Sequence, residues 1–420
     1  MLHLRSVLVA AAALFVSNTV AVSSAAFVSD LESIKFTINI PQEENSNELY
    51  FSMSGPSSCS WLAVGLGSSN MKNSLMFMAY KDKTGQNVTL SPRLSYNNVE
   101  PVYTSEVKVT YLPGTGVFDN ITTVNAKCSN CRQWKEGSID PKQTEANFIW
   151  ANAGVGNLKS NSLTANLKRH GSYGKFKMDL TKAVGAGEAV TPANVSSAGS
   201  AQLSEEADHD FSSGAHALIM IFTFVGLIPL AVMILRILNS PKWHGIVQTI
   251  SATLALIGMG LGFKIGTMYN RTKKFNSAHQ VIGLIVILAM IGQFILGFLH
   301  HRMYSQTKLP TKLGPIHVWL GRFVVLLGIV SGFVGFPLAQ NSIFNWPLLG
   351  LVLFGIIFSG PFIFWRWRRN MQKANKAEAA KAPSGGYQAE PWRGDHSQND
   401  VDLQQMNHQA PPPMYSNQYR

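Results

Sequence analysis

The chain has 420 residues, of which 46% are hydrophobic and only 14% charged, whereas about 25% of the residues of an ordinary soluble domain are charged. The formal net charge of +12 is unevenly placed: residues 1–210 hold 17 Lys or Arg against 18 Asp or Glu, residues 211–370 hold 13 against none, and residues 371–420 hold 5 against 5. The excess therefore lies on the apolar part of the chain and indicates membrane topology, not nucleic-acid binding. The lack of acidic residues there argues against a carboxylate-driven transporter, and three cysteines exclude a disulfide-framed miniprotein.

Residues 1–26 have the pattern of a secretory signal peptide. Arg5 is followed by an apolar run over residues 7–16 and by small residues at positions 24–26. We expect the mature chain to begin near Phe27 and the next segment to lie outside the cytosol.

Residues 27–182 predict an all-β, immunoglobulin-like sandwich. Short β-type runs are closed by Gly, Pro, Asn or Ser clusters, as in antiparallel sandwiches. The runs cover residues 34–40, 61–66, 75–80, 106–111, 121–127 and 148–151. Glycosylation sequons, consistent with secretion, begin at Asn87, Asn120, Asn194 and Asn270.

Residues 183–210 are rich in Ala, Gly, Ser and Glu without an apolar period, which predicts a flexible linker. Five apolar runs follow, each long enough to cross a hydrocarbon core of about 30 Å, and they predict a five-helix transmembrane domain over residues 211–368. The runs cover residues 215–236, 243–263, 278–299, 314–337 and 344–365.

With the sandwich outside and five crossings, the C-terminus is expected in the cytosol, and the plasma membrane is the expected location. Basic residues on the cytosolic loops agree with the positive-inside rule, although the loop with Lys264, Arg271, Lys273 and Lys274 is also basic. Residues 369–420 have few aliphatic residues and predict a disordered tail. It ends in Pro412–Tyr415, a Pro-Pro-x-Tyr match to ligands of WW-domain proteins.

Four histidines mark the starts of four consecutive runs, at His216, His244, His279 and His317. Because successive helices cross in opposite directions, His216 and His279 are expected near the outer face, and His244 and His317 near the cytosolic face. Imidazoles from facing helices can bind one iron from both sides, so two stacked haem b groups are expected. A single such histidine could equally be an interfacial or hydrogen-bonded side chain. Arg322, five residues after His317, is a candidate partner for a haem propionate or for backbone carbonyls.

Residues 211–365 resemble the core of the DOMON-linked cytochrome b561 family. The resemblance rests on residues 216–220, 243–244, 278–280 and 317–322. It implies a diheme core that pairs His216 with His279 and His244 with His317, and electrons drawn from an ascorbate-like reductant on the cytosolic side.

Residues 65–75 and 169–180 resemble the cytochrome domain of cellobiose dehydrogenase. That resemblance implies a third haem b, bound by Met71 and His170. Met76 and Met78 are nearby competitors, although on a strand they would share one face as core residues.

Cys128 and Cys131 form a CxxC pair, which in a cytosolic protein would indicate redox exchange or half of a zinc site. In a secreted domain a local disulfide is the expected role, and the resemblance implies it as well. Cys59 is expected to lie buried beside Trp61.

These features predict an oxidoreductase that passes electrons from a cytosolic reductant through two bis-histidine haems to an extracellular Met/His haem. A ferric chelate, an ascorbate radical or a secreted oxidoreductase would be the final acceptor. The apolar helices would be surrounded by membrane lipid. The alternative is a haem-free sandwich that binds a sugar or another small ligand and is displayed on the bundle.

Overall fold

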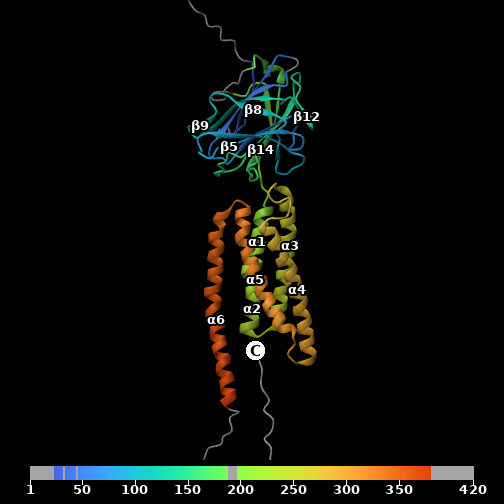
Figure 1. The fold of residues 1–420 in the computed structure, drawn as a ribbon, viewed down its shortest axis with the longest axis vertical. Helices are drawn as coiled ribbons and strands as arrows, with labels where there is room; N and C mark the ends of the chain where they lie inside the picture. Colours follow the sequence, from blue (N-terminus) through green and yellow to red (C-terminus); the bar gives the residue numbers. More distant parts are fainter. Residues whose placement is uncertain (1–22, 32–33, 44–45, 188–195, 380–420) are drawn as a thin grey trace, which may run out of the picture. The chain divides into compact units, whose positions relative to one another are not determined.

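The computed structural model describes residues 23–31, 34–43, 46–187 and 196–379. The sequon at Asn194, most of the predicted signal peptide and the Pro412–Tyr415 motif lie outside the described residues. The strands gather in an N-terminal domain and the long helices follow, as Figure 1 shows.

The N-terminal domain is a sandwich of two mainly antiparallel sheets. The first sheet has the order β1-β2-β3-β10-β8, with β15 on β2 and β9 on β10. Its strands are β1 Ala25–Val28, β2 Lys35–Pro41, β3 Leu49–Pro56, β8 Lys108–Tyr111, β9 Gly116–Phe118, β10 Ile121–Ser129 and β15 Val184–Gly185.

The second sheet has the order β16-β14-β13-β4-β5-β6-β7 and carries the residues of interest. Its strands are β4 Leu62–Leu66, β5 Leu75–Lys81, β6 Val88–Leu94, β7 Val102–Tyr103, β13 Ala146–Asn152, β14 Ser172–Met178 and β16 Ser200–Ala207. A hairpin, β11 Gln133–Trp134 with β12 Gly137–Ser138, and a 3₁₀ turn, Leu180–Ala183, complete the domain.

Both faces of the second sheet are buried, and β5 shows how. Leu75, Phe77 and Ala79 face the main core between the two sheets. Met76 and Met78 alternate with them and belong to a second apolar cluster with Trp61 and Leu167. This second cluster covers the other face of the sheet.

The structure corrects three predicted boundaries. The linker predicted over 183–210 is largely ordered: β15 pairs with β2, and β16 pairs with β14 as an edge strand. Its small and polar residues suit a half-exposed edge, where no apolar period is needed. Ala25 and Ala26, assigned to the signal peptide, are buried in β1, and residues 369–379, assigned to the disordered tail, continue helix α6.

Five helical stretches in the described residues are long and apolar enough to span a membrane, and none of the described residues in 211–370 is acidic. The first, Ser212–Leu238, comprises α1 Ser212–Ile221, a π-helical turn Phe222–Leu227, α2 Ile228–Met233 and a second π-helical turn Ile234–Leu238. The others are α3 Pro241–Met268, α4 Ala278–Thr307, α5 Leu313–Leu338 and α6 Asn345–Ala379, the last preceded by a 3₁₀ turn Ser342–Phe344.

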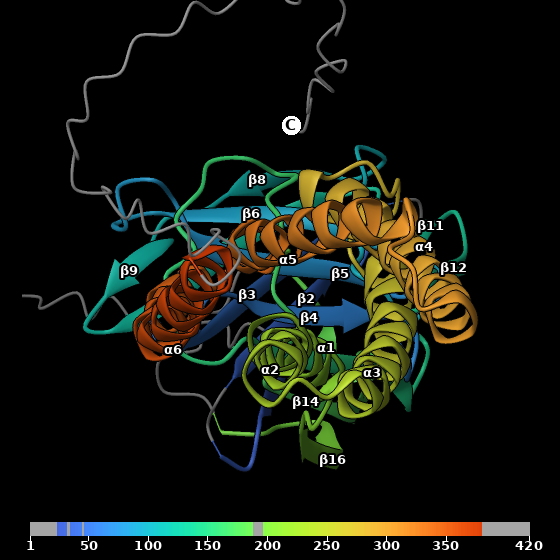
Figure 2. The ribbon, with the colours of Figure 1, turned by 90° about the horizontal axis from the view of Figure 1, so that it is seen from below.

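The helix ends follow from local signals. Pro241 opens α3, where its missing N–H has no intrahelical partner to lose. Ser277 caps α4 through a capping box with Gln280, which fixes His279 in the first turn of that helix. Figure 2 looks along the helices and shows α3 beside α1, and α4 between α3 and α5. Their shared core includes Phe224, Ala255, Val286 and Val324.

Candidate functional site

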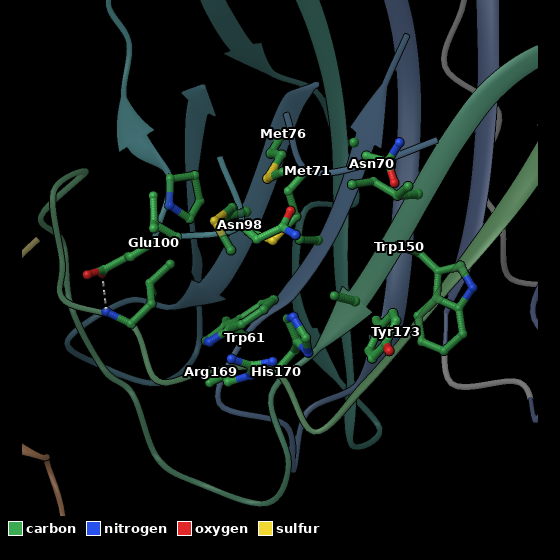
Figure 3. Close-up of a pocket in the computed structure, with 18 of the residues that line it drawn as sticks. Trp61, Asn70, Met71, Met76, Asn98, Glu100, Trp150, Arg169, His170 and Tyr173 are labelled. Atoms are coloured by element: carbon green, nitrogen blue, oxygen red, sulfur yellow. Dashed lines mark hydrogen bonds between the residues drawn. The ribbon is translucent and has the colours of Figure 1, made fainter. Parts of the chain in front are cut away.

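A cavity of about 510 Å³ lies against the second cluster of the sandwich. This volume is within the range of pockets that hold small molecules and cofactors. Figure 3 shows Met71 and Met76 on one side of the cavity, and Trp61, Arg169 and His170 on the opposite side. The two segments quoted for the cytochrome-domain resemblance therefore meet at one cavity.

Met71 is held by a tight turn before β5. The Ser74 hydroxyl donates to the carbonyl of Asn70 over 2.6 Å, and the Asn73 N–H donates to the carbonyl of Ser95. Asn73 adopts a positive φ of 66°, a conformation that asparagine tolerates well. Met71 is half-buried, whereas Met76 and Met78 are buried on β5 and line the same cavity.

His170 lies in the loop that leads into β14. The indole of Trp61 donates to the carbonyl of Lys168 over 3.0 Å, and the N–H of Gly171 donates to the carbonyl of Asn152. These two bonds anchor the loop on either side of His170. Burial lowers the pKa of His170, which favours the neutral imidazole that a metal requires.

Asp208 is the charged neighbour of His170. Its Oδ2 lies 3.0 Å from Nδ1 of His170, and it also accepts a hydrogen bond from Arg169. Nδ1 of His170 is buried and makes no hydrogen bond, because an N–H there is poorly aligned with the carboxylate. Burial alone would raise the pKa of Asp208, but hydrogen bonds from Arg169 and from the N–H of Asp210 outweigh it and lower the pKa.

Loops of the sandwich contact the loops at one end of the helices, here called the sandwich-side end. Glu100 is buried and accepts hydrogen bonds from the N–H groups of Leu167 and Asn270, over 2.8 and 2.7 Å. Arg271 donates to the carbonyls of Leu167 and Leu338, over 3.0 and 2.9 Å. Burial lowers the pKa of Arg271. Through these contacts Lys264, Met268 and Tyr269 also line the cavity.

His216 and His279 meet at the sandwich-side end of the bundle. Their ring centroids are 5.9 Å apart with the planes at 88°. Nδ1 of His216 lies 2.7 Å from the carbonyl of Gly258, and Nδ1 of His279 lies 2.9 Å from the carbonyl of Ser331. A carbonyl can only accept, so each Nδ1 carries the proton and each Nε2 keeps a lone pair for a metal.

His244 and His317 are less directly associated. Nδ1 of His244 lies 2.8 Å from the carbonyl of Ala231. Nε2 of His317 lies 3.3 Å from the amide nitrogen of Gln293, while its Nδ1 is buried without a hydrogen-bond partner. Each ring thus has one defined polar contact. The sequence did not predict Gln293 as a neighbour of His317.

Glycines on the facing helices make room for three of these rings. A Cβ added at Gly262 would come within 3.0 Å of His216, one at Gly335 within 2.9 Å of His279, and one at Gly297 within 2.8 Å of His317. Their spacing alone could not show which glycine faces a histidine.

Arg322 does not join the histidines. It is exposed, and its guanidinium stacks on the exposed ring of Trp319 at 4.6 Å. A long cationic side chain on a membrane-facing surface satisfies its charge in this way without an acidic partner. The expectation of a propionate partner therefore finds no support in the geometry.

The remaining predicted sites fall on the sandwich and its contact loops. Cys128 and Cys131 form a disulfide, and Cys59 is a free, half-buried cysteine. Asn87 and Asn120 are exposed. The amide nitrogen of Asn270 donates one of its two hydrogens to the carbonyl of Pro101 over 3.1 Å. Glycosylation at Asn87, Asn120 and Asn270 stays a prediction.

Comparison with known proteins agrees with this division of the chain. Residues 16–187 match the family described as the cytochrome domain of cellobiose dehydrogenase, and residues 215–345 match the family described as eukaryotic cytochrome b561. The chain therefore joins a cytochrome-type sandwich to a cytochrome b561 core, and it is a multi-pass membrane protein of the electron-transfer class.

Three similar proteins each match less than two fifths of this chain. A pyrroloquinoline quinone-dependent pyranose dehydrogenase from Coprinopsis cinerea is 28% identical over 131 residues, which is 31% of this chain and 18% of that protein. The chain thus spans less than a fifth of that relative. The solved cytochrome b domain of pyranose dehydrogenase from Coprinopsis cinerea covers 38% of this chain and 84% of its own length, with 22% identity and a TM-score of 0.36. The cytochrome domain of Myriococcum thermophilum cellobiose dehydrogenase gives the same coverage, with 19% identity and a TM-score of 0.33.

The residues present fit haem b at two places. A metal–imidazole bond of about 2 Å on each side, plus two ring radii, separates ring centroids by about 6 Å, and His216 and His279 match that separation. In the sandwich, a thioether and an imidazole share a cavity of cofactor size. His244 and His317 supply the same donor type at the other end of the bundle.

Proposed function

We propose that this chain carries electrons from a cytosolic, ascorbate-like reductant across the membrane to an extracellular acceptor. Membership of the two cytochrome families supports transmembrane electron transfer in general. The proposed order of sites is His244 with His317, then His216 with His279, then Met71 with His170. The sandwich would lie on the extracellular side.

Haem b, when bound at these sites, supplies an iron that accepts and releases one electron. The chain's part is to hold it, orient it and exclude water. Carbonyls of Gly258, Ser331 and Ala231 fix the imidazoles of His216, His279 and His244 with Nε2 free. The glycines opposite the rings of His216, His279 and His317 allow close approach. The apolar cluster around Trp61, Met76 and Met78 excludes water from the sandwich cavity.

The direction rests on two physical arguments. Met/His ligation raises the potential of a haem relative to bis-histidine ligation, so an electron in the bundle would move toward the sandwich. A membrane potential that is negative inside adds about 2.3 kcal/mol per electron per 100 mV in the outward direction. Basic residues Arg236, Lys242, Arg302 and Lys312 would attract an anionic reductant at the cytosolic mouth.

The observation that carries the proposal is the 5.9 Å separation of the His216 and His279 rings, which come from helices far apart in the sequence. A secreted oxidoreductase is one acceptor of suitable chemistry. A ferric chelate and an ascorbate radical are the other acceptors of suitable chemistry.

The test is the haem-to-protein ratio of the purified full-length chain, with reduced-minus-oxidised spectra. We expect three haems, with one lost in Met71→Ala and in His170→Ala. Met76→Leu is the matched control, because Met76 lines the same cavity and should not ligate. Two haems, unaffected by Met71 or His170, would leave a haem-free sandwich on a diheme bundle. No haem would overturn the proposal.

A further inference from the structure

Asp208 lies between the last strand of the sandwich and the first helix. It follows β16 directly, and its N–H donates to the carbonyl of Gly171 over 2.8 Å. That bond places its carboxylate beside His170, with only 8% of the side chain exposed. The backbone of Asp208 is therefore bonded directly to the residue that follows His170, which keeps the carboxylate close to the ring.

The partner of His170 differs from those of the bundle histidines. Nδ1 of His216, His244 and His279 each faces a neutral backbone carbonyl. Nδ1 of His170 faces a carboxylate, at 3.0 Å. A carboxylate at this distance from the second ring nitrogen places a negative charge beside the imidazole even without an aligned hydrogen bond. A negative charge beside an iron ligand favours the oxidised iron.

Arg169 moderates that charge. Its Nε binds the same carboxylate oxygen of Asp208, and its Nη1 binds Asp210 over 2.8 Å. Arg169 also lines the cavity, so its positive charge favours the reduced iron. Asp208 and Arg169 thus act on one site with opposite sign.

We propose that Asp208 lowers the reduction potential of the sandwich haem site through the negative charge that it holds beside His170, and that Arg169 opposes this effect. The inference rests on the proposed function, because it requires a haem at His170. Methionine ligation alone would set this site far above the bundle. The carboxylate lowers the potential of the sandwich site toward that of the bundle sites. An electron received from the bundle can then still be passed to an acceptor of moderate potential.

The experiment is a spectroelectrochemical titration of the full-length chain. Subtracting the titration of His170→Ala isolates the sandwich component. Asp208→Asn keeps an oxygen that can accept from Nδ1 but removes the charge, so the midpoint potential of this component should rise. Arg169→Gln should lower it. Asp208→Ala should also weaken haem retention in the sandwich by about 10- to 100-fold.

Glu206→Gln is the matched control. Glu206 lies on β16 two residues before Asp208 and accepts a hydrogen bond from Tyr173, whose ring lies 4.9 Å from that of His170. The variant therefore removes one negative charge close to His170 but keeps an oxygen for Tyr173 and leaves the Asp208 contact in place. Its potential should equal that of the unmodified chain. The bundle haems in each sample report whether the chain has folded.

An unchanged potential in Asp208→Asn, with the sandwich haem bound, would overturn this inference and leave the proposed function intact. Equal shifts in Asp208→Asn and Glu206→Gln would also overturn it, because they would show a general charge effect. A chain whose spectrum is the same with and without His170 would overturn both the inference and the haem assignment of the sandwich.

Discussion

At the scale of single residues, the bundle is organised by contacts between imidazoles and glycines on the neighbouring helix. His216 and Gly262 show the pattern: the ring lies where any larger residue would place its Cβ, within 3.0 Å. A ring held between a carbonyl and a glycine has little freedom to turn. The glycine therefore acts on ligand geometry as well as on helix packing.

This arrangement predicts unequal effects for two glycines of the same helix. Gly262→Ala should displace the His216 ring and reduce the haem content at this pair, or alter its spectrum. Gly260→Ala should leave both unchanged, because an added Cβ there has open space within 4 Å. Haem spectra of the two purified variants test this, and equal loss in both would contradict it.

The sequence could predict the histidines but not their neighbours. Regular spacing on apolar helices placed His216, His244, His279 and His317 at two depths, and the ring contact of His216 with His279 agrees with that prediction. The roles of Gln293 and Asp208 depend on contacts across the fold, which leave no local pattern. Arg322 was assigned by depth alone, and depth does not determine which face of a helix a side chain occupies.

At the scale of elements, β16 changes the definition of the sandwich domain. It pairs with β14 over residues Ser172 to Met178, and β14 follows directly on the loop that carries His170. Without β16, the backbone of β14 would be an open edge, and Asp208 would have no fixed position. Composition misled the prediction here, because an edge strand half exposed to water needs no apolar alternation.

A soluble fragment that ends at residue 185 should therefore be less stable than one that ends at residue 210. We expect a lower melting temperature and a tendency to associate through the exposed edge. Circular dichroism melting and size-exclusion chromatography of fragments 23–185 and 23–210 provide the measurement. Equal melting temperatures would show that β16 is dispensable.

At the scale of the whole molecule, hydrogen bonds join sandwich loops to loops at the sandwich-side end of the helices. Glu100, which is buried, and Arg271, which is half-buried, are two of the charged groups at this contact. Each bonds to backbone groups of the opposite partner. Hydrogen bonds to backbone groups fix the relative position of the two loops closely, because a backbone group cannot change rotamer as a side chain can.

Arg271→Ala should loosen this contact. One of its two hydrogen bonds, to the carbonyl of Leu167, crosses to the sandwich, and the loss of such a bond from a charged donor corresponds to about 1.5–3 kcal/mol. Electron transfer from the bundle to the sandwich should therefore slow while the haem content stays constant. Lys274→Ala, an exposed residue of the same loop, is the control. Stopped-flow reduction of the full-length chain measures the rate, and an unchanged rate would show that the contact plays no part in transfer.

The short stretch after β16 limits how far the sandwich can move from the helices. Only residues 208–211 separate β16 from the first helix, and four residues extend about 13–14 Å at most. Even a released sandwich would stay at a high effective concentration next to the membrane. Under the proposed function, the acceptor would therefore have to reach the sandwich, and the face of the sandwich left uncovered would determine the geometry of that encounter.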